Sequence, residues 1–201
     1  MRPLCYAVGV AGLASAASLA TFFRFGQPFG SINDVGNGLV GILSASLAWR
    51  LWRDARQPAG AVWSVVASAG AVLTVAGSWL VVSRTTSFLL AGFVSSVGFG
   101  LIGLWLVAAS RSMRSDASMG GSLARLGTAA GLVMATGVAS IPVVALGVDE
   151  ADAVQPWMWT GSLSWLAVYL LYPIWALLVG RRSGQAARET HRADSLGEAF
   201  R

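Results

Sequence analysis

The sequence predicts an all-α, polytopic integral membrane protein in which six transmembrane helices form one bundle. Hydrophobic residues make up 55% of the chain and charged residues only 11%. The apolar residues form long continuous stretches, and the charged residues lie at the ends of these stretches. Because a charge at the centre of a bilayer costs about 2.5–3.5 kcal/mol on insertion scales, this distribution is typical of membrane-spanning helices.

The expected spans cover residues 4–23, 35–52, 61–83, 88–110, 123–147 and 157–180. A helix rises about 1.5 Å per residue and the hydrocarbon core is about 30 Å thick, so about 20 apolar residues suffice to cross it. Membrane β-strands would show alternating polarity, which these stretches lack. We therefore expect one transmembrane domain at 1–180 and a polar cytoplasmic tail at 181–201, either disordered or lying as a helix on the membrane surface.

The arginines predict the orientation of these helices. The chain has 14 arginines and no lysine. If successive connections between the spans lie on alternate sides of the membrane, twelve arginines share one side and only Arg24 and Arg84 lie on the other. The other side carries Asp34 and the acidic loop 149–152, whose carboxylates are expected to keep the loop in water. The positive-inside rule then places both termini in the cytoplasm. Arginine-only, alanine-rich composition favours a bacterial cytoplasmic membrane.

This asymmetry also bears on partners. Arginines beside the inner leaflet attract anionic lipid headgroups, so the net charge of +5 predicts contact with the lipid bilayer and its inner-face headgroups rather than with nucleic acid. The first span has an alternative interpretation, because Arg2 and the small residues 14–16 resemble a secretory signal peptide. Its apolar run continues through Phe23, beyond the 7 to 15 residues of a signal core, which favours a retained helix.

Residue types needed for catalysis are missing from the spans. The single histidine, His191, lies in the tail, the single cysteine, Cys5, lies near the N-terminus, and neither has a partner nearby in the sequence. We therefore expect no catalytic residues, no metal site and no cofactor, and we expect the protein not to be an enzyme.

The polar segment before the second span has two interpretations. Pro28 and Gly30 predict a turn, Ser31 a helix N-cap, and Asp34 the acidic member of a capping box. This local interpretation is structural.

The functional interpretation rests on spacing. Asn33, Asn37, Gly41 and Ser44 share one helix face, with Asp34 at its outer end. Such a face is expected either to bind a small solute or cation within the bundle, or to join helices through amide hydrogen bonds. Asn33, Asp34, Asn37 and Ser44 are therefore candidate ligand-binding residues.

A second candidate face lies in the last span. Trp165, Tyr169 and Tyr172 follow steps of four and three residues, so they are expected to line a pocket or to bond to a neighbouring helix. Pro142 and Pro173 lie inside the fifth and sixth spans and predict a kink in each helix.

Small residues recur at helical spacing in three spans. Their faces predict close helix packing within the chain, with a homo-oligomer or a channel lining as alternatives. The faces are Ala67, Gly70, Thr74 and Gly77; Gly92, Ser96 and Gly100; and Gly127, Gly131 and Ala135.

Together these features predict a small permease, carrier or channel-like protein for a small solute or ion. The alternative is a membrane-embedded interaction or assembly protein without transport activity.

Overall fold

The structure is a computed structural model that describes residues 1–55, 58–114 and 121–199, and every element in this part of the chain is helical. Arg56 and Arg201, which the sequence places on the basic side, lie outside the described residues. The elements are α1 (Arg2–Phe25), α2 (Phe29–Ala55), α3 (Pro58–Val82), α4 (Phe88–Met113), α5 (Gly121–Ala135), η1 (Thr136–Ser140), α6 (Ile141–Leu146), η2 (Ala151–Ala153), η3 (Pro156–Leu163), α7 (Ser164–Leu166), η4 (Ala167–Leu171) and α8 (Tyr172–Ala199).

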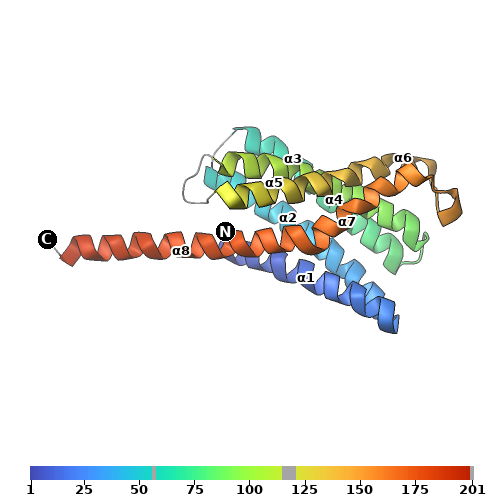
Figure 1. Ribbon diagram of the computed structural model, residues 1–201, viewed down its shortest axis with the longest axis horizontal. Coiled ribbons are helices and arrows are strands. Elements are labelled where there is room, and N and C mark those ends of the chain that lie inside the picture. The colour runs from blue at the N-terminus through green and yellow to red at the C-terminus, as the bar shows by residue number, and fades with distance from the viewer. Residues whose placement is uncertain (56–57, 115–120, 200–201) are drawn as a thin grey trace.

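The long helices form one bundle around α4 (Figure 1). Helix α4 packs between α3 and α5, while α1 packs against α2 and α8, and α2 packs against α3. The chain segment from α5 to α8 completes the bundle, because η4 and α8 contact both α5 and α1. Helix α4 contributes the longest run of buried residues, Ser95–Gly100, so it forms the centre of the core.

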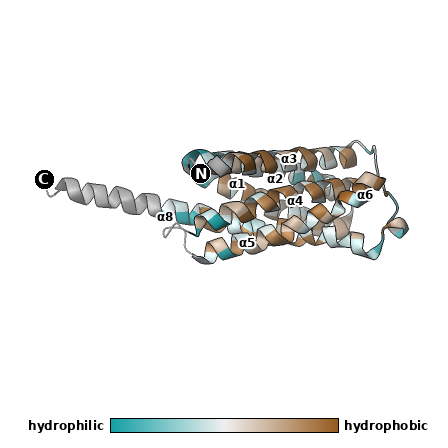
Figure 2. Ribbon diagram, turned by 90° about the horizontal axis from the view of Figure 1, so that it is seen from above, coloured by the Kyte–Doolittle hydropathy of each residue, from teal (hydrophilic) through white to brown (hydrophobic). Residues whose placement is uncertain are grey.

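In the part of the chain that the structure describes, five helical stretches are long and apolar enough to cross a membrane: Arg2–Phe25, Gly60–Val82, Phe88–Met113, Gly121–Leu146 and Pro156–Gln185. Helix α2 has 27 residues but is less apolar, because it carries Asn33, Asp34 and Asn37 near one end and Arg50 and Arg53 near the other. Hydrophobic residues cover the helices along most of their length, and hydrophilic ones gather towards their ends (Figure 2). The predicted all-helical fold, with several helices long and apolar enough to cross a membrane, is therefore confirmed.

The predicted interruptions occur just before the two prolines. Helix α5 ends at Ala135 and tightens into the 3₁₀ segment η1, so Pro142 falls in the first turn of α6, where its missing N–H is not needed. Pro173 is the second residue of α8 and follows η4, a π-helical segment. Both spans are thus divided into shorter helical segments rather than bent at a single residue.

The small-residue faces pack within the chain, as one of the alternatives predicted. Gly70 on α3 and Gly98 on α4 face each other, and a Cβ added to either would lie 2.5–2.6 Å from the carbonyl oxygen of the other. Gly103 and Gly131 bring α4 and α5 together in the same way. Gly92 is the exception, because a Cβ at this position would meet nothing within 4 Å.

The predicted cap of α2 is wrong. The turn lies at Gly26–Pro28, Gly26 supplies the positive φ of 74°, and α2 already begins at Phe29. Ser31 is therefore inside the first turn, and its N–H and hydroxyl donate to the Oε1 of Gln27, each at 3.2 Å. In the predicted capping box, the Asp34 carboxylate would accept the backbone N–H of Ser31. Gln27 accepts this N–H instead, so Asp34 is available for other contacts.

The acidic loop is tied to the N-terminus of α4. The Ser87 hydroxyl accepts the N–H of Leu89 at 3.2 Å and donates to the Asp149 carboxylate. The backbone N–H of Ser87 also donates to Asp149 Oδ2 at 3.3 Å. Asp149 thus places a negative charge at the positive end of α4, a role beyond the solvation predicted from the sequence.

Replacing Ser87 with alanine is expected to destabilise the protein by about 1 kcal/mol, since the N-cap acceptor is lost. Reversible unfolding of the purified protein in mixed detergent micelles measures this change. Ser87→Thr keeps the hydroxyl and should recover most of the loss. Equal destabilisation by the two variants would contradict the capping role.

Helix α8 continues across the predicted boundary at residue 180. It runs from Tyr172 to Ala199 and extends beyond the end of the bundle (Figure 1). Residues 181–199 thus continue the last helix. The Arg2 side chain lies against Gly184, so the N-terminus packs beside α8 at this end.

Candidate functional site

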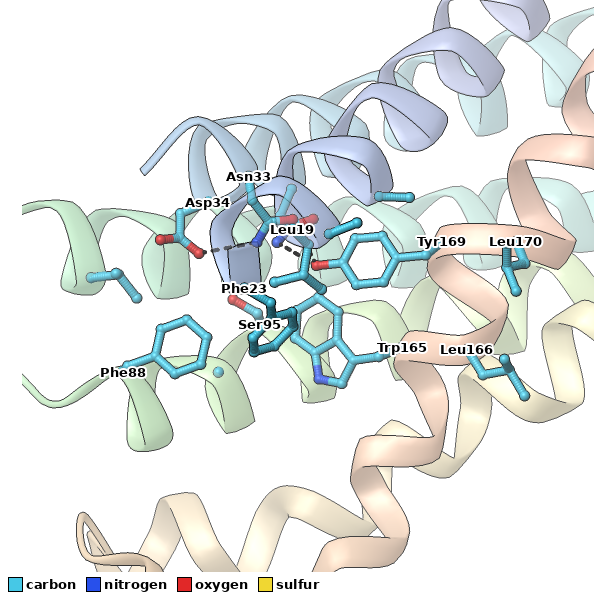
Figure 3. A pocket seen from close by; sticks show the side chains of 15 residues that line it. Leu19, Phe23, Asn33, Asp34, Phe88, Ser95, Trp165, Leu166, Tyr169 and Leu170 are labelled. Atoms are coloured by element: carbon cyan, nitrogen blue, oxygen red, sulfur yellow. Dashed lines mark hydrogen bonds between the residues drawn. The ribbon is translucent and has the colours of Figure 1, made fainter. Parts of the chain in front are cut away.

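A pocket of about 650 Å³ opens between α1, α2, α4 and the α7–η4 segment (Figure 3). Most of its lining is apolar, and its polar side chains come chiefly from the first turns of α2. The lining residues are Ala16, Leu19, Ala20, Phe23, Asn33, Asp34, Asn37, Val81, Phe88, Gly92, Ser95, Trp165, Leu166, Tyr169 and Leu170.

The pocket exists because α1 and α4, which both line it, do not pack closely on each other. Helix α1 contacts α2, α8 and η4, whereas α4 contacts α3, α5 and η1. Gly92 on the α4 wall has no side chain to fill the space between them. The result is a concave site of the size that holds small ligands in other proteins, about 300–1,000 Å³.

Hydrogen bonds connect the polar residues of the pocket into one chain. The Tyr169 hydroxyl donates to Asn33 Oδ1 at 2.9 Å and accepts from Asn37 Nδ2 at 3.1 Å. Asn33 Nδ2 in turn donates to Asp34 Oδ1 at 3.5 Å. All three α2 residues are buried, with exposed fractions of 2–6%. This network joins α2 to η4 across the wall of the pocket.

The direction of this chain follows from its carboxylate. Asp34 accepts, so the group of Asn33 that faces it is the NH₂ group, and the Asn33 oxygen faces Tyr169. A tyrosine hydroxyl has one proton, and giving it to Asn33 leaves the oxygen to accept from Asn37. Asn37 Oδ1 then remains buried without a donor among the described residues. This hydrogen-bonded network therefore ends in an acceptor that no described residue satisfies.

Aromatic rings form the wall opposite α1. The rings of Trp165 and Tyr169 stack with centroids 5.4 Å apart, and Phe99 packs edge-on against Trp165. Phe23 and Phe88 add two further aromatic rings to the pocket lining (Figure 3). The stacking fixes the orientation of Tyr169, so its hydroxyl is held against the two asparagines.

The rim of the pocket is apolar and accessible. The exposed fractions are 80% for Phe23, 61% for Phe88, 56% for Leu166 and 47% for Leu170. Exposed side chains of this kind on a helical surface are those that lipid chains cover in a membrane protein. The opening is thus lined by residues compatible with hydrocarbon, whereas the polar chain lies inside.

Five of the seven candidate residues predicted from the sequence line this pocket: Asn33, Asp34, Asn37, Trp165 and Tyr169. The other two do not. The Tyr172 hydroxyl donates to Ser44 Oγ at 2.8 Å, and Ser44 donates to the Val40 carbonyl. Both side chains are fully buried, so this pair forms a hydrogen bond between α2 and α8 inside the core instead of pocket surface.

The residues that sequence reasoning missed lie mostly on α1 and α4. Leu19, Ala20 and Phe23 give no signal in the sequence, since apolar side chains facing a pocket look like those facing lipid. Gly92 belongs to a stripe that predicted packing, and only its open surroundings show that it faces the pocket. Among the described residues, no group of three or more His, Cys, Asp or Glu side chains could hold a metal ion.

Comparison with protein-family models, curated proteins and solved structures finds no match for this chain.

Proposed function

We propose that this chain is a small carrier of the bacterial cytoplasmic membrane that binds an amphipathic solute in the pocket between α1, α2, α4 and η4. The observation that carries the proposal is a preformed, mainly apolar pocket with one buried hydrogen-bonding wall, made of Asn33, Asp34, Asn37 and Tyr169. Small-molecule sites typically combine apolar lining with a few polar groups that orient the ligand.

The distribution of charge supports an orientation with both termini in the cytoplasm. Arg2 lies beside α8 at one end of the bundle. Because consecutive helices run in opposite directions, Arg50 and Arg53 near the end of α2 and Arg111 near the end of α4 lie at the same end of the bundle. Asp149 lies at the opposite end, against the start of α4. By the positive-inside rule the arginine-rich end faces the cytoplasm, and the pocket opens in the outer half of the bundle.

The interrupted helices support a moving part rather than a rigid receptor. The π-helical segment η4 carries Tyr169, and the 3₁₀ segment η1 packs against α4. Short segments of this geometry make weaker or less regular backbone hydrogen bonds than an α-helix, and they often mark functional sites. A shift of η4 would move Tyr169 away from Asn33 and Asn37, and so couple the ligand site to helix movement. The proposal assigns the chain binding and translocation, and no catalytic step.

A carrier must expose its site to each side of the membrane in turn, which cysteine labelling tests without knowledge of the ligand. In a Cys5→Ala background, Gly92→Cys places one thiol in the pocket, where the structure leaves room for it. We expect an impermeant maleimide to label this thiol in both right-side-out and inverted vesicles, with the rate from the inner side reduced by about tenfold or less.

Two exposed positions serve as matched controls for vesicle orientation. Thr85→Cys lies on the outer turn between α3 and α4, and Ser122→Cys lies at the start of α5 on the other side. Each should react from one side only. If the Gly92→Cys thiol reacts from the outer side alone while both controls behave as expected, the protein is a binding or assembly protein rather than a carrier.

A further inference from the structure

We infer that the pocket takes an amphipathic organic cation with N–H donors, whose ammonium group meets Asp34 and Asn37 and whose apolar body lies against the aromatic wall. This inference names the substrate class of the carrier and rests on the proposed function. It follows from the hydrogen-bonding capacity of the pocket, its charge, its walls and its opening.

The first argument is the excess of acceptors. Asn37 is only 3% exposed, and no donor among the described residues reaches its Oδ1. Within the described part of the chain, Asp34 accepts one side-chain hydrogen bond, from Asn33 at 3.5 Å, although a carboxylate can accept several. Leaving a buried acceptor unsatisfied costs about 1–3 kcal/mol. A ligand that brings donors removes this cost, whereas a ligand that brings only acceptors adds to it.

The second argument is an unbalanced negative charge. Asp34 is 6% exposed, and the ion pair found among the described residues joins Arg50 to Asp54 instead. Arg24 and Arg84, the two arginines on the outer side, are exposed and do not pair with Asp34. Burying an unpaired charge is costly, so buried charges are normally paired. A cationic ligand would supply the partner that the chain lacks.

The third argument is the shape and chemistry of the remaining walls. Trp165 and Tyr169 present stacked rings, and Phe23 and Phe88 lie towards the opening. Aromatic faces attract ammonium groups, by about 0.5–1 kcal/mol at exposed sites and about 2 kcal/mol when desolvated. They also cover an apolar ligand body. The exposed apolar rim is compatible with hydrocarbon and allows the apolar body of such a ligand to enter from the lipid.

Other ligand classes fit less well. An anion would face the Asp34 carboxylate. A bare inorganic cation needs about six or more oxygen ligands, and the polar wall offers few oxygens beside an apolar surface. A neutral alcohol has one donor and brings no charge to balance Asp34.

The test is a matched set of four small probes with one phenyl ring each, titrated into the purified full-length protein in detergent. The probes are phenethylammonium, its N,N,N-trimethyl derivative, 3-phenylpropan-1-ol and 3-phenylpropionate. Phenethylammonium is expected to bind about tenfold more tightly than the alcohol, through charge and donors together. The trimethyl derivative keeps the charge but has no N–H, and should fall between them. The propionate should bind most weakly.

Asp34→Asn separates charge from hydrophobic partition. This substitution should weaken phenethylammonium binding about tenfold and leave the affinity for the alcohol unchanged. Uptake of the probes by the micelles is the same for both proteins, so it cancels in the comparison. Asp152→Asn is the matched control, an exposed acidic residue outside the pocket, and should leave all four affinities unchanged. Unaltered cation preference in Asp34→Asn overturns the inference, and so does equal binding of the alcohol or the propionate by the unmodified protein.

A second measurement covers the case in which Asp34→Asn does not fold. Phenethylammonium should slow maleimide labelling of Gly92→Cys in the otherwise unchanged site, and 3-phenylpropan-1-ol at the same concentration should slow it less. Equal protection by sodium chloride alone would assign the site to an inorganic ion and overturn the inference. Labelling of Gly92→Cys from both membrane faces would still support a carrier, so the two proposals fail separately.

Discussion

Gly98→Ala is expected to destabilise the protein by about 2–3 kcal/mol, although it adds a single methyl group. The new Cβ would lie 2.6 Å from the Gly70 carbonyl oxygen and 2.7 Å from the Thr74 backbone nitrogen. Both are backbone atoms, so no side-chain rotation relieves the contact, and α3 and α4 must move apart. Overpacking of a close-packed core costs about 1–3 kcal/mol. Reversible unfolding in mixed micelles measures the loss.

Gly92→Ala is the matched control, since it makes the same change on the same helix. Its Cβ meets nothing within 4 Å, and alanine favours a helix over glycine by about 1 kcal/mol. The two variants should therefore change stability in opposite directions. If both stabilise the protein, the α3–α4 crossing is looser than the structure indicates.

This pair of glycines also shows what the sequence could predict about the fold. The helices follow from long apolar stretches, because a span needs only length and the exclusion of charge. The stripes of small residues correctly predicted close helix approaches at Gly70 and Gly131, whereas their partners Gly98 and Gly103 on α4 lie outside the predicted stripe. Spacing alone could not separate Gly92 from Gly100, since both belong to the same stripe. Only the position of α1 relative to α4 leaves Gly92 without a neighbour.

The predicted cap shows a different limit. Ser31 and Asp34 satisfy the sequence pattern of a capping box, but Gln27 is four residues from Ser31 and reaches the same N-terminal groups. Local patterns describe what a segment can do alone, and a competing side chain one turn earlier changes the result. The helix consequently starts two residues before the predicted cap, and Asp34 faces the pocket with Asn33 and Asn37.

The polar part of the candidate site could be predicted from the sequence, because its residues stand out within apolar helices. Buried polar groups need partners, so Asn33 and Asn37 on α2 and Tyr169 in the last span could be singled out, and the structure joins them. The depth of each residue could not be predicted. Ser44 and Tyr172 follow the same faces one or two turns away, but they lie fully buried in the core and bond to each other instead.

Gly92→Trp is expected to abolish ligand binding while leaving the fold intact. The side chain would start from open space on the α4 wall and extend into the pocket, where its indole can pack against Trp165 and Phe88. An indole covers about 150–250 Å² of surface, which is enough to displace a phenyl-sized ligand. Phenethylammonium affinity should fall at least about tenfold, and the unfolding transition should remain cooperative with an unchanged or higher midpoint.

Gly121→Trp tests whether this effect is specific to the pocket. It introduces the same side chain at another glycine with open surroundings, on α5 and outside the pocket lining, so binding should be retained. Binding that survives in Gly92→Trp would place the ligand elsewhere. Binding that is lost in both variants would indicate a general effect of a bulky aromatic on the bundle. If only Gly92→Trp loses binding, the ligand and the indole compete for the same volume. This result assigns binding to the space between α1 and α4, and it does not depend on any change to Asp34.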